Sequence, residues 1–153
     1  MKKLIAVRHG EYDHSHGSLV LRGEEQIKLL AVALSSHIKG EKVRLFHSPF
    51  TRTAESAFIL GRILNVEFEM CVALERDDFS DANHIADALQ KQLGNSYDNV
   101  DILIVVTHFE APAGLINHFM TEGHIDNFLS DWEISKGTAL VLNIESNEVT
   151  VLP

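Results

Sequence analysis

The sequence predicts an α/β fold: a three-layer α/β/α sandwich around a mostly parallel central sheet with an antiparallel edge strand. Short apolar runs typical of strands alternate along the chain with longer segments whose apolar residues recur at helical spacing. The longest continuous apolar run, over residues 102–106, is typical of a central strand that is covered on both faces. Two final runs, over residues 138–144 and 149–152, are separated by a short polar turn and predict a closing hairpin.

The first part of the chain alternates strand and helix twice. A strand over residues 4–7 precedes a polar loop over residues 12–18, and the helix after this loop ends just before Gly40. A second strand over residues 43–46 leads through Ser48 and Pro49 into a helix over residues 50–64. The apolar face of the first helix is formed by Ile27, Leu30, Ala31, Leu34 and Ile38.

The remaining elements flank the central strand. A half-exposed strand is expected over residues 66–70, where apolar residues alternate with glutamates. Ser80 is expected to cap the next helix, which ends at Gly94. That helix carries the apolar residues Ile85, Ala86, Leu89 and Leu93. Another helix follows the central strand, with Pro112 tolerated in its first turn.

Composition and charge restrict the possible functions. The chain has 153 residues, of which 45% are hydrophobic, and we expect a single domain over residues 1–153. Its 22 acidic and 13 basic residues give a net charge of -9, which disfavours nucleic-acid and anionic-membrane partners. A single cysteine, Cys71, excludes an intramolecular disulfide, and the first apolar run is too short for a signal peptide or a membrane span. We therefore expect a cytoplasmic protein.

Basic residues follow three of the predicted strands at the point where each strand ends. Arg8 and His9 follow the first strand, Arg52 comes shortly after the second, and His108 follows the central strand. The carboxyl ends of parallel strands meet at one edge of a sheet, which is where ligands bind in open α/β folds. Guanidinium groups offer a rigid fork of donors to a phosphate, and histidine can act as base, acid or nucleophile. The sequence therefore predicts a phosphate site at this edge, with Gly10 allowing a close approach of the backbone.

Four motifs are spread over nearly the whole chain. They are Arg8-His9-Gly10-Glu11, Gly23-Glu24-Glu25-Gln26, Ser-Pro-Phe-Thr-Arg-Thr-Ala-Glu-Ser-Ala at residues 48–57, and Val106-Thr107-His108. In this order they resemble the histidine phosphatase (phosphoglycerate-mutase-like) superfamily. The resemblance implies a phosphatase in which His9 takes up the phosphoryl group, with Arg8, Arg52 and His108 around the phosphoryl oxygens. It also implies that this covalent phosphohistidine forms and hydrolyses without a metal or another cofactor.

The resemblance further indicates residues that contact the substrate. We expect Gly10, Glu11, Ser15 and Phe109 to bind it. The family often has a small residue, commonly glycine, after the second histidine, whereas this chain has Phe109 and Glu110, so Phe109 is expected to line or narrow the entrance. The expected partner is a phosphorylated small molecule or a phosphohistidine protein.

An alcohol or phenol leaving group needs a proton donor. Much of the family supplies a carboxylic acid from the loop after the third strand, where Glu75 is the best match here; Glu11 and Glu110 are further candidates. A solvated acidic loop is an equally good interpretation of Glu75. The chain lacks the long insertion of larger members and is similar in size to the small phosphohistidine phosphatases. Those tend to lack the acid, because a phosphorylated imidazole is already a good leaving group.

Other interpretations of the sequence are open. Asp13, His14 and His16 crowd one loop and have side chains that ligate zinc, although Arg8 would repel a cation. The favoured interpretation is a solvated loop over the substrate entrance, with His14 or His16 touching the substrate. The same fold also supports a non-catalytic phosphate-binding regulatory module, against which the intact His9 and His108 argue. A phosphoglycerate-type mutase is a third possibility, and the missing insertion argues against it.

Overall fold

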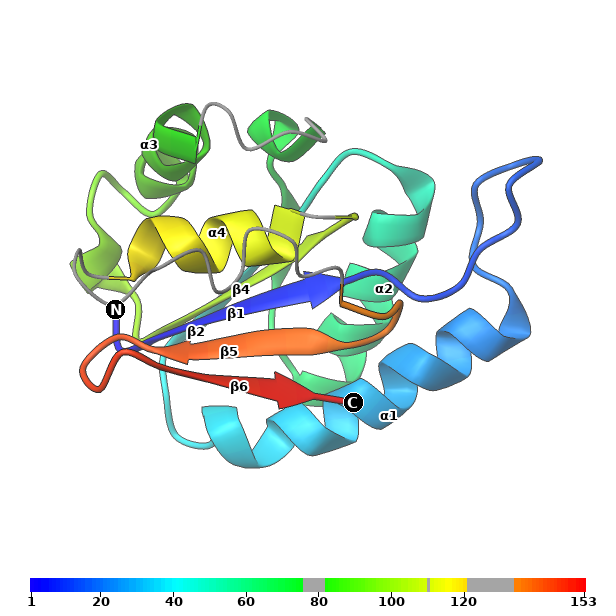
Figure 1. Ribbon diagram of the computed structural model, residues 1–153, viewed down its shortest axis with the longest axis horizontal. Coiled ribbons are helices and arrows are strands. Elements are labelled where there is room, and N and C mark those ends of the chain that lie inside the picture. Colours follow the sequence, from blue (N-terminus) through cyan, green and yellow to red (C-terminus); the bar gives the residue numbers. More distant parts are fainter. Residues whose placement is uncertain (76–81, 110, 121–133) are drawn as a thin grey trace.

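The computed structural model describes residues 1–75, 82–109, 111–120 and 134–153. Within these residues, six strands form one sheet in the order β3-β2-β4-β1-β5-β6 (Figure 1). The strands are β1 (Lys3–Arg8), β2 (Val43–His47), β3 (Phe68–Met70), β4 (Ile102–Thr107), β5 (Ala139–Asn143) and β6 (Glu148–Leu152). The first four run parallel to one another, and β5 is antiparallel to both of its neighbours. The predicted mostly parallel sheet is confirmed.

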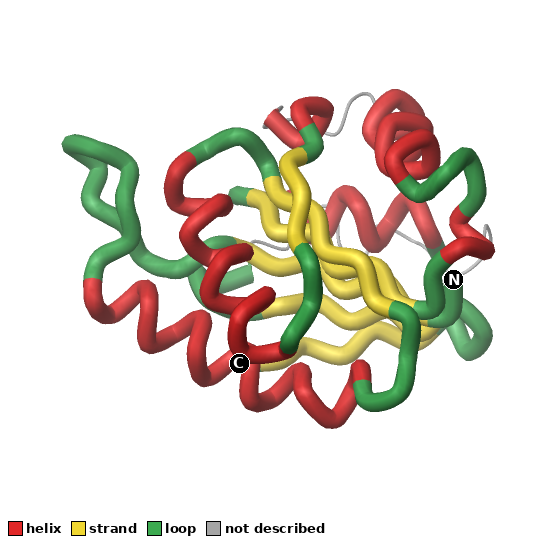
Figure 2. The backbone as a smooth tube through the Cα atoms, turned by 180° about the vertical axis from the view of Figure 1, so that it is seen from behind, coloured by secondary structure: helices red, strands yellow, loops and turns green. Residues whose placement is uncertain are grey.

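Helices cover both faces of this sheet. The helices α1 (Leu21–Ile38) and α2 (Thr51–Leu64) pack against each other on the face seen in Figure 2. On the other face lie α3 (Ala82–Gln92) and α4 (Ala111–Phe119), and Figure 1 shows α4 in front of the sheet. Two short 3-10 helices, η1 (Val72–Glu75) and η2 (Tyr97–Asn99), are additions to the predicted elements. The three-layer α/β/α sandwich is confirmed, and none of the described helices is long and apolar enough to cross a membrane.

Two hydrophobic layers hold the sandwich together, one on each face of the sheet. In β1, Leu4 and Ala6 belong to the layer under α3 and α4, whereas Ile5 and Val7 belong to the layer under α1 and α2. All four side chains are fully buried. Burying each of the larger ones stabilises the fold by about 1.5–3 kcal/mol. Because successive side chains are buried on opposite faces, the central strands are continuous apolar runs in the sequence.

Three details of the structure qualify the predicted elements. The predicted antiparallel edge strand is β6, which pairs antiparallel with β5 through the hairpin turn at Asn147 (φ 58°), so that β5 lies one strand inside the edge. The strand β3 begins at Phe68 rather than Val66, whose backbone N–H instead donates to the carbonyl oxygen of Gly61 (2.9 Å) near the end of α2. Ser80 lies outside the described residues, so its capping role stays a prediction.

The register of the strands brings their carboxyl ends level with one another. Arg8 at the end of β1 is opposite Thr107 at the end of β4, and the backbone N–H of His9 donates to the carbonyl oxygen of Thr107 (3.1 Å). On the other side of β4, the backbone N–H of Ser48 donates to the carbonyl oxygen of Val106 (3.1 Å). The residues that follow β1, β2 and β4 therefore leave the sheet at one edge.

Candidate active site

A cavity of about 490 Å³ opens at the carboxyl edge of the sheet. Its described lining comprises Arg8, His9, Tyr12, His14, Arg52, His108, Phe109 and Lys136. The four basic residues expected from the sequence at three separate strand ends are thus brought together in one cavity. The rest of the described lining consists of three residues with rings, Tyr12, His14 and Phe109, and of Lys136 from the segment before β5.

His9 is held in a single orientation by hydrogen bonds at both ring nitrogens. Its side chain is buried, with 2% exposure, and its Nδ1 lies 2.7 Å from the carbonyl oxygen of Gly10. Since a carbonyl oxygen only accepts, Nδ1 carries the proton in this contact. At the other nitrogen, the Nε–H of Arg52 donates to Nε2 of His9 (3.1 Å), which requires a lone pair on Nε2. The neutral tautomer with its lone pair toward the cavity is therefore the one that fits both contacts.

The surroundings of His9 also favour the neutral ring. Burial lowers the pKa of His9 from its usual 6.5 to about 4, and the positive charges of Arg52 and Arg8 contribute to the lowering. The hydrogen bond to Gly10 opposes this shift in the pKa without overcoming it. At neutral pH the imidazole is therefore unprotonated at Nε2, the state in which a histidine can act as a nucleophile.

This low pKa makes folding stability depend on pH. Between about pH 4 and 6.5 the unfolded chain binds a proton at this histidine and the folded chain does not, so stability rises with pH across that window and levels off above it. We expect His9 to account for a change on the order of 3 kcal/mol. Urea unfolding of wild type and His9→Gln at several pH values checks this. A stability difference between the two proteins that stays constant from pH 4 to 7 would contradict it.

Arg52 is placed against His9 by two aromatic rings. It lies near the start of α2, and its guanidinium carbon is 4.7 Å from the ring centre of Tyr12 and 4.5 Å from that of Phe50. Contacts of this kind contribute about 0.5–1 kcal/mol when exposed and more when desolvated. The rings fix the direction of the guanidinium fork, so its donors are available where a phosphoryl group would meet Nε2 of His9.

Arg8 and His108 complete the basic side of the cavity, and both are buried. Arg8 donates from Nη1 to the carbonyl oxygen of Ile134 (2.7 Å), and its guanidinium lies 5.5 Å from the ring centre of Phe109. His108 donates from Nε2 to the carbonyl oxygen of Leu74 (3.2 Å), because that oxygen can only accept. A hydrogen bond to a backbone carbonyl oxygen therefore anchors each of these two side chains.

The second of the four sequence motifs, Gly23-Glu24-Glu25-Gln26, has a structural explanation. Gly23 in α1 packs directly on the backbone of Gly10 and Glu11, and a Cβ atom added to either glycine would collide with backbone atoms of the other segment. In addition, the backbone N–H of Gly10 donates to Oγ of Ser56 in α2 (3.2 Å). The loop that carries the carbonyl partner of His9 is therefore clamped between α1 and α2.

Three of the expected site residues are placed elsewhere among the described residues. Glu75 is exposed at the end of η1 and is not part of the described lining of the cavity. Glu11 faces Arg22, with 3.7 Å between Oε1 and Nε. Ser15 is exposed and donates to Asp13 through its backbone N–H and its hydroxyl. Glu110, a further candidate acid, lies outside the described residues.

Phe109 does line the cavity, as expected from the sequence, and it has an unusual backbone. Its side chain is 49% exposed, and its φ of 49° lies in the left-handed region that favours glycine. Glycine adopts this conformation without a steric penalty, whereas a phenylalanine in it carries some backbone strain.

Two lining residues, Tyr12 and Lys136, were not predicted from the sequence. Tyr12 lies three residues after His9, and its ring contacts the His9 ring edge-on at 5.1 Å between centres, so its closeness to the motif was a usable signal. Lys136 is distant in the sequence and reaches the cavity only because β5 pairs with β1. No sequence pattern pointed to it.

The loop considered as a possible metal site is arranged differently from a metal centre. Asp13 and His16 contact each other, with 3.3 Å between Oδ2 and Nε2, while His14 lines the cavity and contacts Tyr12. Across the part of the chain that the structure describes, no group of three or more His, Cys, Asp or Glu side chains is positioned to hold a metal ion.

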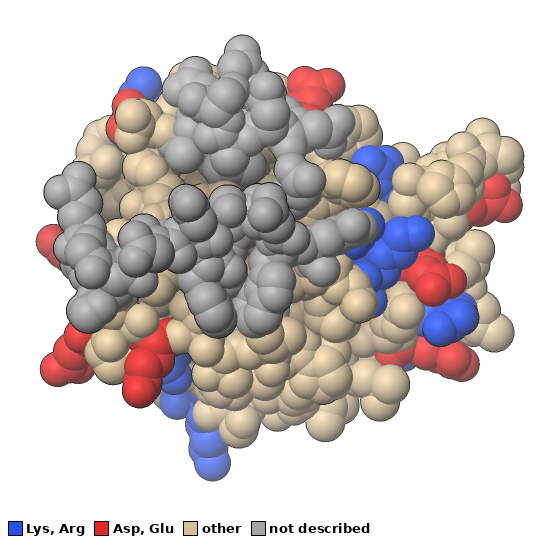
Figure 3. Space-filling model, in the orientation of Figure 1, with Lys and Arg blue, Asp and Glu red and all other residues tan. Residues whose placement is uncertain are grey.

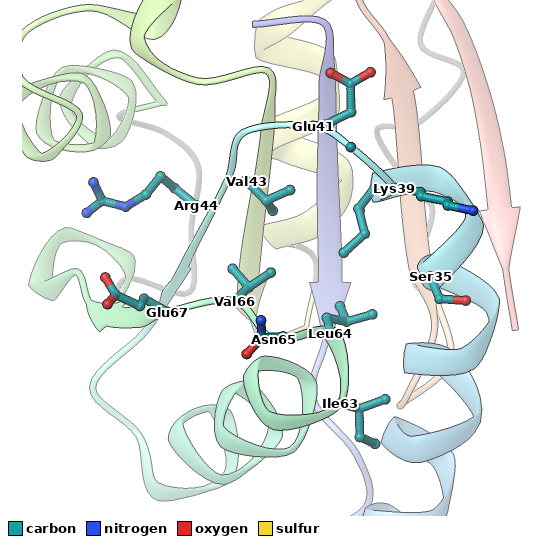
Figure 4. Close-up of a pocket in the computed structure, with 12 residues that line it drawn as sticks. Ser35, Lys39, Glu41, Val43, Arg44, Ile63, Leu64, Asn65, Val66 and Glu67 are labelled. Atoms are coloured by element: carbon teal, nitrogen blue, oxygen red, sulfur yellow. The ribbon is translucent and has the colours of Figure 1, made fainter.

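A second cavity, of about 550 Å³, lies at the opposite edge of the sheet (Figure 4). It forms where α1 and α2 end and β2 begins. Its described lining includes two basic residues, Lys39 and Arg44, and two acidic residues, Glu41 and Glu67. None of the described lining residues is a histidine. The buried His9, Arg8 and His108 therefore line the cavity at the carboxyl edge and not this second one.

Comparisons with known proteins support the fold. No protein-family model and no curated protein matches the sequence. Among solved structures, the protein histidine phosphatase SixA complexed with tungstate is 20% identical, with a TM-score of 0.70 over 99% of this chain and 94% of that chain. A mycobacterial glucosyl-3-phosphoglycerate phosphatase complexed with VO3 is 15% identical, with a TM-score of 0.68 over 99% and 97%. The phosphoglycerate mutase of Plasmodium falciparum is 19% identical, with a TM-score of 0.62 over 99% and 89%. The chain thus has the fold of the histidine phosphatases and phosphoglycerate mutases, as its motifs implied.

Proposed function

We propose that this chain is a member of the histidine phosphatase superfamily and hydrolyses a phosphomonoester or phosphohistidine without metal, through a covalent phosphohistidine on His9. One observation carries the proposal. The Nε2 atom of a buried, neutral His9 holds a lone pair in a cavity whose other described charged groups include two arginines. A nucleophile surrounded by positive charge is suited to attack a phosphorus atom that carries negative oxygens. The single cysteine supports a cytoplasmic location for this activity.

The first step forms a bond between Nε2 of His9 and phosphorus while the bond to the leaving group breaks. For this to happen, the Nε–H of Arg52 turns from Nε2 to a phosphoryl oxygen, which keeps its hydrogen bond and uncovers the lone pair. Arg8 and His108 meet the remaining oxygens, and such preorganised donors stabilise charge that is spread over the transition state. The Nδ1–H donated to Gly10 keeps the ring oriented as it gains positive charge.

The second step returns the enzyme to its starting state. A water molecule attacks phosphorus, the bond between phosphorus and nitrogen breaks, and its electron pair returns to Nε2 of His9. Phosphate leaves with the oxygen of the water, and the proton that the water loses replaces the proton that the acid gave to the leaving group. Splitting hydrolysis in this way replaces one difficult step by two easier ones.

Glu75 stays our candidate for the acid that protonates an alkoxide leaving group. The carbonyl oxygen of the preceding residue, Leu74, accepts a hydrogen bond from His108, so the backbone of Glu75 lies beside the cavity although its side chain is exposed. We expect Glu75→Gln to slow alkyl phosphate hydrolysis at least tenfold and phosphohistidine hydrolysis much less, because only the alkoxide needs a proton. Steady-state assays on both substrates check this, and equal effects would remove Glu75 from the acid role.

The proposal is tested by trapping the intermediate. Wild-type protein is treated with EDTA, mixed with an aryl phosphate, 3-phosphoglycerate or a phosphohistidine protein, and quenched within a single turnover. The expected result is hydrolysis in EDTA and a protein-bound phosphoryl group that is stable in alkali and lost in acid, as a phosphorus–nitrogen bond is. Hydrolysis that requires added metal, or turnover without such an intermediate, would overturn the mechanism. Binding without turnover would instead indicate a regulatory module, and transfer back to the substrate a mutase.

A further inference from the structure

Lys136 is tied to the backbone of the nucleophile. It lies in the turn before β5, where the next residue, Gly137, adopts a φ of 73°. The backbone N–H of Gly137 donates to the carbonyl oxygens of both His9 (2.9 Å) and Arg8 (3.1 Å). A Cβ atom at Gly137 would collide with the side chain of Gln26, so the turn is also packed against α1. The position of Lys136 beside the cavity is therefore fixed by the fold.

The side chain of Lys136 reaches the cavity next to Tyr12. Its Nζ atom lies 5.2 Å from the centre of the Tyr12 ring, the same ring that Arg52 contacts at 4.7 Å. Lys136 is half-buried, and none of the carboxylates in the described parts of the chain forms an ion pair with it. Figure 3 shows Lys and Arg side chains near the carboxyl end of β1, with Asp and Glu side chains beside them.

The guanidinium of Arg52 and the ammonium of Lys136 are suited to bind different parts of a substrate. Arg52 donates directly to Nε2 of His9, so it meets the phosphoryl group at the point of attack. Lys136 is placed on the ring of Tyr12 rather than on the His9 ring, among the side chains that also include His14 and Phe109. An ammonium on a flexible stem acts as a point charge and needs no bidentate partner. It is thus suited to a second, smaller anion carried by the part of the substrate that leaves.

We propose that Lys136 is a specificity-determining residue that binds a second negatively charged group, such as a carboxylate, on the leaving-group side of the substrate. The inference rests on the proposed function only in that the phosphoryl end of the substrate lies at His9. A substrate whose only anionic group is the phosphoryl group leaves the positive charge of Lys136 without a negative partner on the substrate. The preferred substrates are therefore phosphorylated compounds that carry another anion a few atoms from the phosphoryl group.

Binding of phosphonates, which are not hydrolysed, tests this without relying on turnover. Phenylphosphonate is compared by calorimetry with 3-carboxyphenylphosphonate and 4-carboxyphenylphosphonate, using wild type, Lys136→Gln and the control Lys91→Gln, whose lysine is exposed on α3. In wild type and the control, we expect one carboxylated compound to bind about tenfold more tightly than phenylphosphonate at low salt. Such a preference corresponds to about 1.4 kcal/mol. Lys136→Gln should reduce this preference to less than twofold, because it weakens binding of the carboxylated compound more than binding of phenylphosphonate.

Other outcomes would overturn the inference. Equal weakening of all three compounds by Lys136→Gln would mean that Lys136 contacts the phosphoryl group itself. The inference also fails if wild type shows no preference, if it binds none of the compounds, or if the preference does not weaken between 50 and 500 mM salt, since charge pairs near the surface are screened. Failure of the proposed function would be seen in a separate experiment, as turnover that persists when His9 is replaced by alanine.

Discussion

His9→Ala is expected to lose phosphatase activity by a factor on the order of 10⁴ or more. The substitution removes the only atom that our mechanism uses to form a bond to phosphorus, and the remaining cations of the cavity can only bind the substrate. Binding of tungstate or phosphate should persist within about tenfold, because Arg8, Arg52 and His108 still face the anion. Turnover assays together with calorimetric titration of tungstate separate these two effects.

A matched control shows that the loss comes from chemistry rather than unfolding. His118 is exposed in the last turn of α4, so His118→Ala should retain full activity. His9→Ala should unfold cooperatively in urea, as wild type does. Should His9→Ala keep more than about a hundredth of the wild-type rate, the covalent mechanism would have to be abandoned.

Arg52→Ala is expected to lower kcat/KM by a factor on the order of 10²–10³, equivalent to about 3–4 kcal/mol of transition-state stabilisation. This guanidinium is placed both to meet the phosphoryl oxygens and to contact Nε2 of His9. Its loss also removes the contacts with Tyr12 and Phe50. Kinetics on an aryl phosphate, with single-turnover measurement of the phosphorylation step, test the prediction.

Arg52→Lys distinguishes charge from geometry. Lysine restores the positive charge but not the planar fork that stacks between two rings, so we expect it to recover less than a tenth of the lost rate. The control Arg62→Ala removes an exposed arginine from the same helix and should have no effect on kcat/KM. Full recovery in Arg52→Lys would show that the charge alone matters and that the stacking on Tyr12 and Phe50 does not.

Much of this fold follows from local patterns in the sequence. The buried strand before Arg8 and the longer run before His108 are continuous apolar segments, and the parallel register of β1 and β4 makes their ends coincide. A site built from residues directly after strands can therefore be predicted once the strands are recognised. The positions of Arg8, His9, Arg52 and His108 in one cavity agree with that expectation, while the roles assigned to them remain for the experiments above.

Other parts of the site depend on long-range contacts that leave no local signal. Lys136 enters the cavity through the pairing of β5 with β1, which the sequence indicated only as a closing hairpin of unknown partner. Conversely, Glu11 and Ser15 are close to His9 in the chain, yet their side chains engage Arg22 and Asp13 instead of the cavity. Nearness in sequence was a poor guide for polar side chains that have charged neighbours of their own.

In the protein without ligand, the hydrogen bond from Arg52 occupies the lone pair on Nε2 of His9. A neutral imidazole nitrogen in a cell is open to alkylating agents and to stray transition-metal ions, both of which need its lone pair. Here that electron pair is already engaged by a positively charged donor that also repels cations. Under the proposed mechanism, a phosphorylated substrate offers the guanidinium a better acceptor, so the compound that His9 attacks is also the one that frees its lone pair.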